Sequence, residues 1–291
     1  MGIDVYALQL LRWASSKSHG LGVTATIGRQ SMNVPANELK HQVTLPADYQ
    51  YSQYCEELLI SALGATRVDS FDNSDFEGCT YIADMNKLLS PPCQYDTIID
   101  SGTLEHIYNM PQALQNLSLL CASGGQILHI LPANNQCGHG FWQISPELFF
   151  SLYSTKTGYS ETQVFIVDTD DETAWYEVMP PSKGRRATVW SDTSLYILCR
   201  TVRQGDFCHD NIQQSDYVFA WNKDTGESIP EELLVTPSKL RNSLKKTSGS
   251  VRLVKLVRYI YLSLAVCFGL KRGSLAGRNP SLIRRRVSEM I

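Results

Sequence analysis

The chain has 291 residues, of which 43% are hydrophobic and 19% charged, so it can bury a full α/β core and is not a disordered polypeptide. The net charge of −3 hides an asymmetry, because residues 1–235 carry 13 Lys and Arg against 28 Asp and Glu, whereas residues 236–291 carry 13 against 1. This split indicates an acidic body and a basic end with different tasks.

The cysteines and the N-terminal region indicate a cytoplasmic protein. None of the eight cysteines forms a C-x-x-C pair, so we expect no disulfide framework and no metal site. The neighbours Cys137/His139 and Cys208/His209 lack further metal ligands nearby in the sequence. The short apolar run after Asp4 is broken by Arg12, so we also expect no signal peptide.

The first half of the chain alternates between helix and strand patterns. Residues 1–20 predict a short helix and a loop, and helices with one apolar face are predicted over 54–63 and 110–120. Runs of apolar and β-branched residues predict five strands, over 22–28, 65–71, 80–83, 95–100 and 126–131. This alternation predicts parallel βα units in a doubly wound sheet.

After the fifth strand the pattern changes. A helix predicted over 146–153 is followed by strands over 161–168 and 194–201, joined by an acidic, proline-containing loop. With no helix between them, these strands predict an antiparallel hairpin at the sheet edge. The predicted fold class is α/β: a doubly wound, mostly parallel seven-stranded sheet with an antiparallel edge hairpin and a C-terminal helical tail.

Polar residues follow the predicted strands, where a doubly wound sheet binds its ligands. Asp72 is suited to accept ribose hydroxyls, Asp84 to read an adenine amino group, and Met85 to pack on the ring. Gly28 allows close backbone approach, and Arg29 is suited to pair with a carboxylate such as that of a methionine moiety. An acid at one strand end also serves to cap the following helix, and one arginine alone is often simply solvated. The series of polar residues at successive strand ends is therefore what favours a nucleoside site.

One segment resembles a known family. Residues 95–106, Tyr-Asp-Thr-Ile-Ile-Asp-Ser-Gly-Thr-Leu-Glu-His, are similar to the fourth strand and following turn of class I S-adenosylmethionine (AdoMet)-dependent methyltransferases, and residues 124–130 to the fifth strand. The resemblance covers roughly residues 20–202. It implies a Rossmann-like methyltransferase fold, AdoMet as cofactor, methyl transfer as activity, and Ser101 and Glu105 beside the cofactor.

The loop after the first strand departs from the family, which has a glycine-rich loop of the form E/D-x-G-x-G-x-G there. Here residues 26–33 are Thr-Ile-Gly-Arg-Gln-Ser-Met-Asn, with Gly28 as the only glycine. Either Arg29 and Gln30 supply a different cradle, or the site has lost its ligand. The absence of G-x-G-x-x-G disfavours a dinucleotide-binding dehydrogenase.

Candidate catalytic residues follow the fourth and fifth strands. His139 lies between two glycines and is either a general base or a structural histidine that ties down its loop, and His106 is suited to positioning. Phe141 and Trp142 are suited to wall a pocket. The chain has no N/D-P-P-Y/F/W motif after the fourth strand, and such a motif would indicate a DNA or protein-glutamine acceptor. We therefore expect a small-molecule or saccharide substrate. A non-catalytic binding or scaffold protein is the alternative.

The basic end divides the chain into a body over 1–235, a flexible linker over 236–250 and a tail over 251–291. Residues 251–272 predict an amphipathic basic helix that contacts an anionic membrane surface, or else packs on the body or on a second subunit. The uncharged run 259–270 is short of the roughly 20 residues that span a bilayer. We therefore expect peripheral membrane association, and nucleic acid as an unlikely partner.

Overall fold

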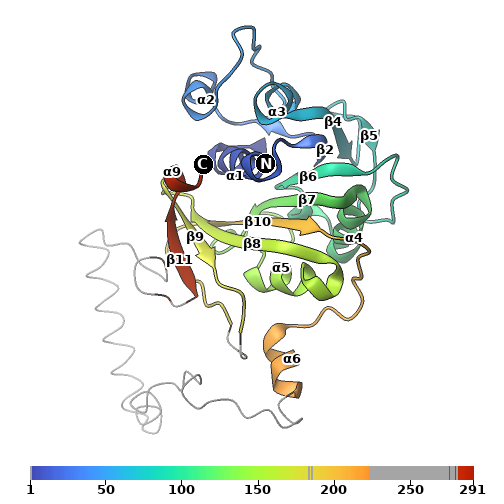
Figure 1. Ribbon diagram of the computed structural model, residues 1–291, viewed down its shortest axis with the longest axis vertical. Helices are drawn as coiled ribbons and strands as arrows, with labels where there is room; N and C mark the ends of the chain where they lie inside the picture. Colours follow the sequence, from blue (N-terminus) through green and yellow to red (C-terminus); the bar gives the residue numbers. More distant parts are fainter. Residues whose placement is uncertain (1, 183, 185, 223–274, 276–278, 280) are drawn as a thin grey trace, which may run out of the picture.

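The computed structural model describes residues 2–182, 184, 186–222, 275, 279 and 281–291, and shows a twisted central sheet with helices on both faces (Figure 1). The described strands form a sheet in the order β11-β9-β8-β10-β7-β6-β2-β4-β5. Five of them are mutually parallel: β2 (Gly22–Ile27), β4 (Ala65–Asp72), β5 (Tyr81–Ile82), β6 (Tyr95–Ser101) and β7 (Cys121–Pro132).

Antiparallel strands continue the sheet beyond β7. Strand β10 (Leu195–Arg203) lies antiparallel to both β7 and β8 (Tyr159–Asp168). Counted along the chain, the seven strands that the sequence predicted have the spatial order 3-2-1-4-5-7-6, with the seventh antiparallel. The predicted doubly wound, mostly parallel α/β fold of Rossmann-like methyltransferase type is therefore confirmed.

Helices cover the two faces of the sheet and bury two apolar layers. Helices α1 (Val5–Ser18) and α3 (Glu56–Leu63) pack on one face, and α4 (Met110–Leu120) and α5 (Pro146–Leu152) on the other. The ends of these helices follow local rules, since the Asp4 side chain accepts the Ala7 N–H at the start of α1 and Gly64, with φ of 71°, ends α3. The remaining elements are short: β1 (Gly2–Ile3), β3 (Ser31–Met32), α2 (Ala36–Gln42), η1 (Leu104–His106), η2 (Thr155–Thr157) and α6 (Ser215–Asn222).

The described sheet has nine strands instead of the predicted seven, and the predicted hairpin is not at its edge. Strand β9 (Ala174–Val178) lies inside the segment predicted as an acidic loop and pairs with β8, and β11 (Leu282–Arg286) pairs with β9. The physical reason is the apolar run within that loop, because Trp175 is buried against Trp13 and Phe165.

The C-terminal end lies on the body, beside α1 (Figure 1). Residues 281–291 supply β11 and the short helix α9 (Val287–Met290), and Arg285 in β11 bonds Glu177 at 2.8 Å. The end of the predicted 251–291 tail is thus part of the sheet. The linker 236–250 and the amphipathic segment 251–272 lie outside the described residues. Within the described part of the chain, no helix is long and apolar enough to cross a membrane.

We predict that Trp175→Ala lowers the free energy of unfolding by about 3–5 kcal/mol, because it removes a buried aromatic side chain from the layer under α1. Chemical denaturation measures the loss. Trp221→Ala, at a side chain that is 58% exposed, is the matched control and should change the free energy by less than about 0.5 kcal/mol. Equal effects of the two variants would contradict the packing described for β9.

Candidate functional site

A pocket of 310 Å³ opens where β2, β4, β5 and β6 end. Five residues predicted as site residues line it: Gly28, Asp72, Asp84, Met85 and His106. Its volume is at the lower end of the ~300–1,000 Å³ range of small-molecule sites. Residues that follow four different strands therefore line one pocket.

The pocket combines apolar walls with the two carboxylates of Asp72 and Asp84. Met85 is buried and Ile107 nearly so, and both line the pocket. Hydrogen bonds from Asn86 and the nearby Lys87 ammonium, 3.0 Å away, hold the pKa of Asp84 below its usual range. The Asp84 side chain is therefore a carboxylate acceptor at neutral pH.

The loop after β2 is a tight turn whose interior is filled by the chain's own side chains. Gly28 has φ of 74°, and a Cβ there would meet Thr103 Oγ1 at 2.8 Å. The buried Gln30 side chain donates from Nε2 to the Ile27 carbonyl at 2.6 Å and lies 3.3 Å from Thr103 Oγ1. Gln30 thus takes the space beneath the turn, with its Nε2 engaged and its buried Oε1 without a partner among the described residues.

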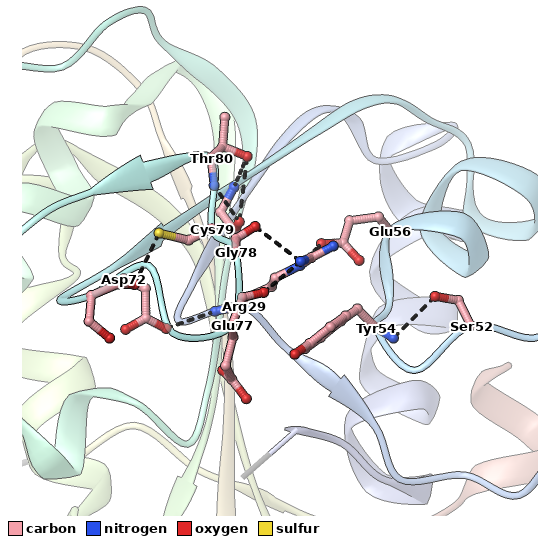
Figure 2. A network of polar contacts seen from close by, with 11 residues as sticks. Arg29, Ser52, Tyr54, Glu56, Asp72, Glu77, Gly78, Cys79 and Thr80 are labelled. Atoms are coloured by element: carbon pink, nitrogen blue, oxygen red, sulfur yellow. Dashed lines mark hydrogen bonds and ion pairs between the residues drawn. The ribbon is translucent and has the colours of Figure 1, made fainter.

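Arg29 does not line the pocket, and its guanidinium is engaged by the protein (Figure 2). Nε donates to Glu56 Oε1 at 2.7 Å, and one terminal nitrogen donates to the carbonyls of Glu77 and Gly78 at 2.6 and 3.0 Å. The guanidinium also stacks on the Tyr54 ring, 4.0 Å from its centroid. The predicted pairing of Arg29 with a ligand carboxylate is therefore replaced by a structural role, joining the β2 loop to α3 and to the β4–β5 loop.

Arg29 also contributes to the pocket indirectly. Its backbone N–H donates to Asp72 Oδ2 at 3.2 Å (Figure 2), so the same residue orients the carboxylate predicted to bind ribose. Only this hydrogen bond to the Asp72 side chain is found among the described residues.

Ser101 lies outside the pocket as well. Its buried Oγ donates to the Gly2 carbonyl at 3.0 Å, and β1 pairs in parallel with β3. The predicted cofactor contact of Ser101 is thus replaced by a contact that fixes the N-terminal segment at the end of β6.

Glu105, His106 and His139 form a cluster behind the pocket. Glu105 is fully buried, and neither carboxylate oxygen has a hydrogen-bond partner among the described residues. Its Oε1 lies 3.4 Å from His139 Nε2 and 3.8 Å from His106 Nε2. Burial, and next the charge of Asp100, raise the pKa of Glu105 to about 8, whereas burial and then His139 lower the pKa of His106.

The loop between β7 and α5 is held on this cluster by backbone bonds. Gly140 has φ of 76°, and a Cβ there would meet the Glu105 carbonyl oxygen at 2.7 Å. The Phe141 N–H donates to the same oxygen at 2.7 Å, and Trp142 Nε1 donates to the Ile107 carbonyl at 2.9 Å. Because these bonds already fix the loop, the His139 imidazole is not needed to tie it down, which disfavours its purely structural interpretation.

The pocket is also lined by residues that the sequence analysis did not select. Each of them is a close chain neighbour of a predicted site residue. They are Phe71, Asn73, Ala83, Asn86, Thr103 and Ile107. His129 is fully buried mid-strand, with Nδ1 2.8 Å from Asp100 Oδ2 and Nε2 2.9 Å from the Tyr153 hydroxyl. Both ring nitrogens of His129 are therefore engaged within the core of the sheet.

Comparisons with known proteins concern the fold. No protein-family model matches the chain, and no curated protein matches it. Among solved structures it is similar to the N-methyltransferase NodS from Bradyrhizobium japonicum WM9, at 17% identity and a TM-score of 0.40, covering 68% of this chain and 93% of that one.

Two further structures are similar at the same level. A putative methyltransferase from Bacillus halodurans C-125 has 11% identity and a TM-score of 0.38, over 70% of this chain and 99% of its own. A 1,6-didemethyltoxoflavin-N1-methyltransferase from Burkholderia thailandensis has 14% identity and a TM-score of 0.35, over 70% and 82%. The fold assignment itself rests on the strand order.

We predict that Arg29→Ala lowers the free energy of unfolding by about 1–3 kcal/mol, because it leaves Glu56 and two carbonyls without their charged donor. Urea denaturation measures the loss, and Lys87→Ala, at an exposed side chain, is the control. An Arg29→Ala chain as stable as the wild type would show that the guanidinium is free to serve a ligand instead.

Proposed function

We propose that the chain binds AdoMet in the pocket at the ends of β2, β4, β5 and β6, and transfers its methyl group to a small-molecule acceptor. One observation carries the proposal: Gly28, Asp72, Asp84, Met85 and His106 come from four strand ends and line one pocket. Acids from two neighbouring strands with apolar walls between them suit a nucleoside, which has polar ribose edges and an apolar ring.

The residues present fit the nucleoside half of AdoMet better than its amino-acid half. We assign Asp72 to the ribose hydroxyls, Met85 and Ile107 to the flat faces of adenine, and Asp84 to its amino group, since all four residues line the pocket. Arg29 and Gln30 are engaged within the protein, so neither is available for the methionyl carboxylate. We therefore expect the adenosyl group to supply most of the affinity.

The acceptor side of the proposed site carries imidazoles and exposed aromatic rings. Bound AdoMet supplies an electrophilic methyl group, and the protein must align a nucleophile with it and assist the loss of its proton. His106 lines the pocket, and the His139 ring lies 5.3 Å from it, centroid to centroid. Tyr108 and Phe141, 75% and 67% exposed, each follow one of these histidines by two residues, and their rings contact each other edge to face. Both rings are suited to stack on a planar or sugar acceptor. We assign activation of the acceptor to the two histidines.

A non-catalytic binding or scaffold role is the second candidate. The filled turn beneath Gly28 and the engaged Arg29 favour it, because both occupy places where a ligand's amino-acid end would be held. This alternative differs from the first in one measurable respect: the pocket would not bind the cofactor.

We predict that calorimetry on the full chain detects binding of AdoMet and of its demethylated product. The dissociation constant of 5′-methylthioadenosine, which lacks the amino-acid part, should lie within about tenfold of that of AdoMet, which corresponds to about 1.4 kcal/mol. Asp72→Ala should weaken binding at least tenfold, because it removes the proposed ribose acceptor. Asp48→Ala, at an exposed acid outside the pocket, is the matched control. If neither AdoMet nor its product binds at millimolar concentration, the scaffold alternative holds.

We also infer from composition that residues 251–272 bring the protein to anionic membranes. Vesicles containing phosphatidylserine should sediment the full chain, and binding should fall as salt rises. Replacing Arg252, Lys255 and Arg258 together by serine should abolish sedimentation while leaving thermal stability unchanged. This variant is preferable to truncation, since a shortened chain loses β11 from the sheet. Sedimentation that is insensitive to both salt and the substitutions would contradict the inference.

A further inference from the structure

We propose that Glu105, His106 and His139 form a binding site for a divalent transition-metal ion beside the pocket. This site goes beyond the proposed cofactor binding, since His106 is the one residue of the three that lines the pocket. Metal binding does not depend on the proposed methyl transfer, although the role given to the ion below rests on it.

The positions of the three donor atoms suit one ion. A carboxylate oxygen of Glu105 and a ring nitrogen from each histidine all lie within 4.8 Å of one another. Glu105 Oε1 is 3.4 Å from His139 Nε2 and 3.8 Å from His106 Nε2. Metal bonds of ~2.0–2.2 Å at tetrahedral angles place ligand atoms about 3.4 Å apart. Binding of an ion would draw these donor atoms closer together, and His106 can move because its side chain is exposed.

Burial gives an independent reason for a cation at this place. Glu105 is fully buried with neither oxygen bonded, and His139 Nε2 is likewise buried without a partner among the described residues. An unpaired buried carboxylate is costly and takes up a proton unless a cation pairs with it, which agrees with the raised pKa of Glu105. The 3.4 Å between Glu105 and His139 exceeds the ~2.7–2.9 Å of a charge-assisted hydrogen bond. A shared cation would satisfy both groups at once.

The fold builds this cluster from two separate strand ends. The turn η1 after β6 presents Glu105 and His106 together, and the loop after β7 delivers His139. Close approach of the loop depends on Gly140, which lies against the Glu105 backbone where any Cβ would collide. Backbone bonds from Phe141 and Trp142 to the Glu105 carbonyl then hold the loop in place. The donors are thus positioned before any ion arrives.

The donor set indicates the class of ion and the use of the site. Two imidazoles and one carboxylate favour Zn²⁺, Fe²⁺ or Mn²⁺ over Mg²⁺ and Ca²⁺, which prefer oxygen ligands throughout. Three protein ligands leave coordination positions open, as in catalytic zinc sites. Since His106 is exposed and lines the pocket, those positions are accessible to an acceptor hydroxyl.

The ion would then activate the acceptor of the proposed reaction. A hydroxyl bound to the ion loses its proton to solvent more readily, because the cation stabilises the oxygen anion. That oxygen forms the new C–O bond while the C–S bond of the sulfonium breaks, which leaves a neutral thioether. The two histidines would thus activate the acceptor, as proposed above, through the cation that they hold, and solvent would take up the proton.

The test uses the full, untagged chain, stripped with a chelator and titrated with Zn²⁺ in the absence of AdoMet. We expect one ion per chain by calorimetry and by metal analysis after dialysis, and visible absorption from Co²⁺ substituted at the same site. Glu105→Gln, His106→Ala and His139→Ala should each weaken Zn²⁺ binding at least tenfold. His41→Ala and Cys137→Ser are the matched controls and should leave binding unchanged.

Two results would overturn the site. The first is a wild-type chain that retains no Zn²⁺ at tenfold molar excess. The second is a Zn²⁺ affinity equal to that of the wild type in Glu105→Gln, His106→Ala and His139→Ala, or a loss of Zn²⁺ binding in Cys137→Ser. Thermal melting without metal tests whether each variant folds. If Glu105→Gln or His139→Ala does not fold, the Zn²⁺ affinity of His106→Ala decides the test, because the His106 side chain is exposed. Because AdoMet is absent throughout, failure of cofactor binding and failure of metal binding are separate outcomes.

Discussion

The parallel register of β2 with its two neighbours is the constraint on which the site depends. Ile27 at the end of β2 pairs with Phe71 in β4 and with Asp100 in β6, so these three strands end level with one another. Whatever residue follows each strand is therefore delivered to the same edge. The pocket is a consequence of this register, because Gly28, Asp72 and the turn after β6 have no other place to lie.

Asp100 transmits the register to the turn that carries the cluster. One of its carboxylate oxygens accepts the N–H groups of Thr103 and Leu104, and the other faces His129. The turn η1 is therefore anchored at its start by a buried carboxylate of the sheet itself. Glu105 follows within this turn, and its burial is the direct result of how the turn is anchored. The cost of that burial is what makes a cation at the cluster physically reasonable.

Local patterns in the sequence were enough for the elements but not for the contacts between them. Helix α4 occupies the predicted residues 110–120, and the strand ends at Asp72 and Asp84 were located because apolar runs stop there. The partners of Arg29 and Ser101 were not predicted because they lie far away in the chain. Glu56 is 27 residues from Arg29, and Gly2 is 99 residues from Ser101.

The edge of the sheet shows the same limit. Strand β11 pairs with β9 over a separation of about a hundred residues, and its run of arginines indicated a solvated tail when considered alone. Nothing in the local pattern of residues 282–286 predicts that Glu177 will pair with Arg285. Pairing over such separations depends on the assembled sheet, whereas hydrophobic periodicity reports only on neighbours in the chain.

The most direct test of the central claim is an experimental structure of the full chain soaked with S-adenosylhomocysteine. The account predicts the adenine ring against Met85 and Ile107, with the ribose hydroxyls on Asp72. A ligand bound elsewhere, or a pocket closed by its own side chains in the presence of saturating ligand, would contradict it.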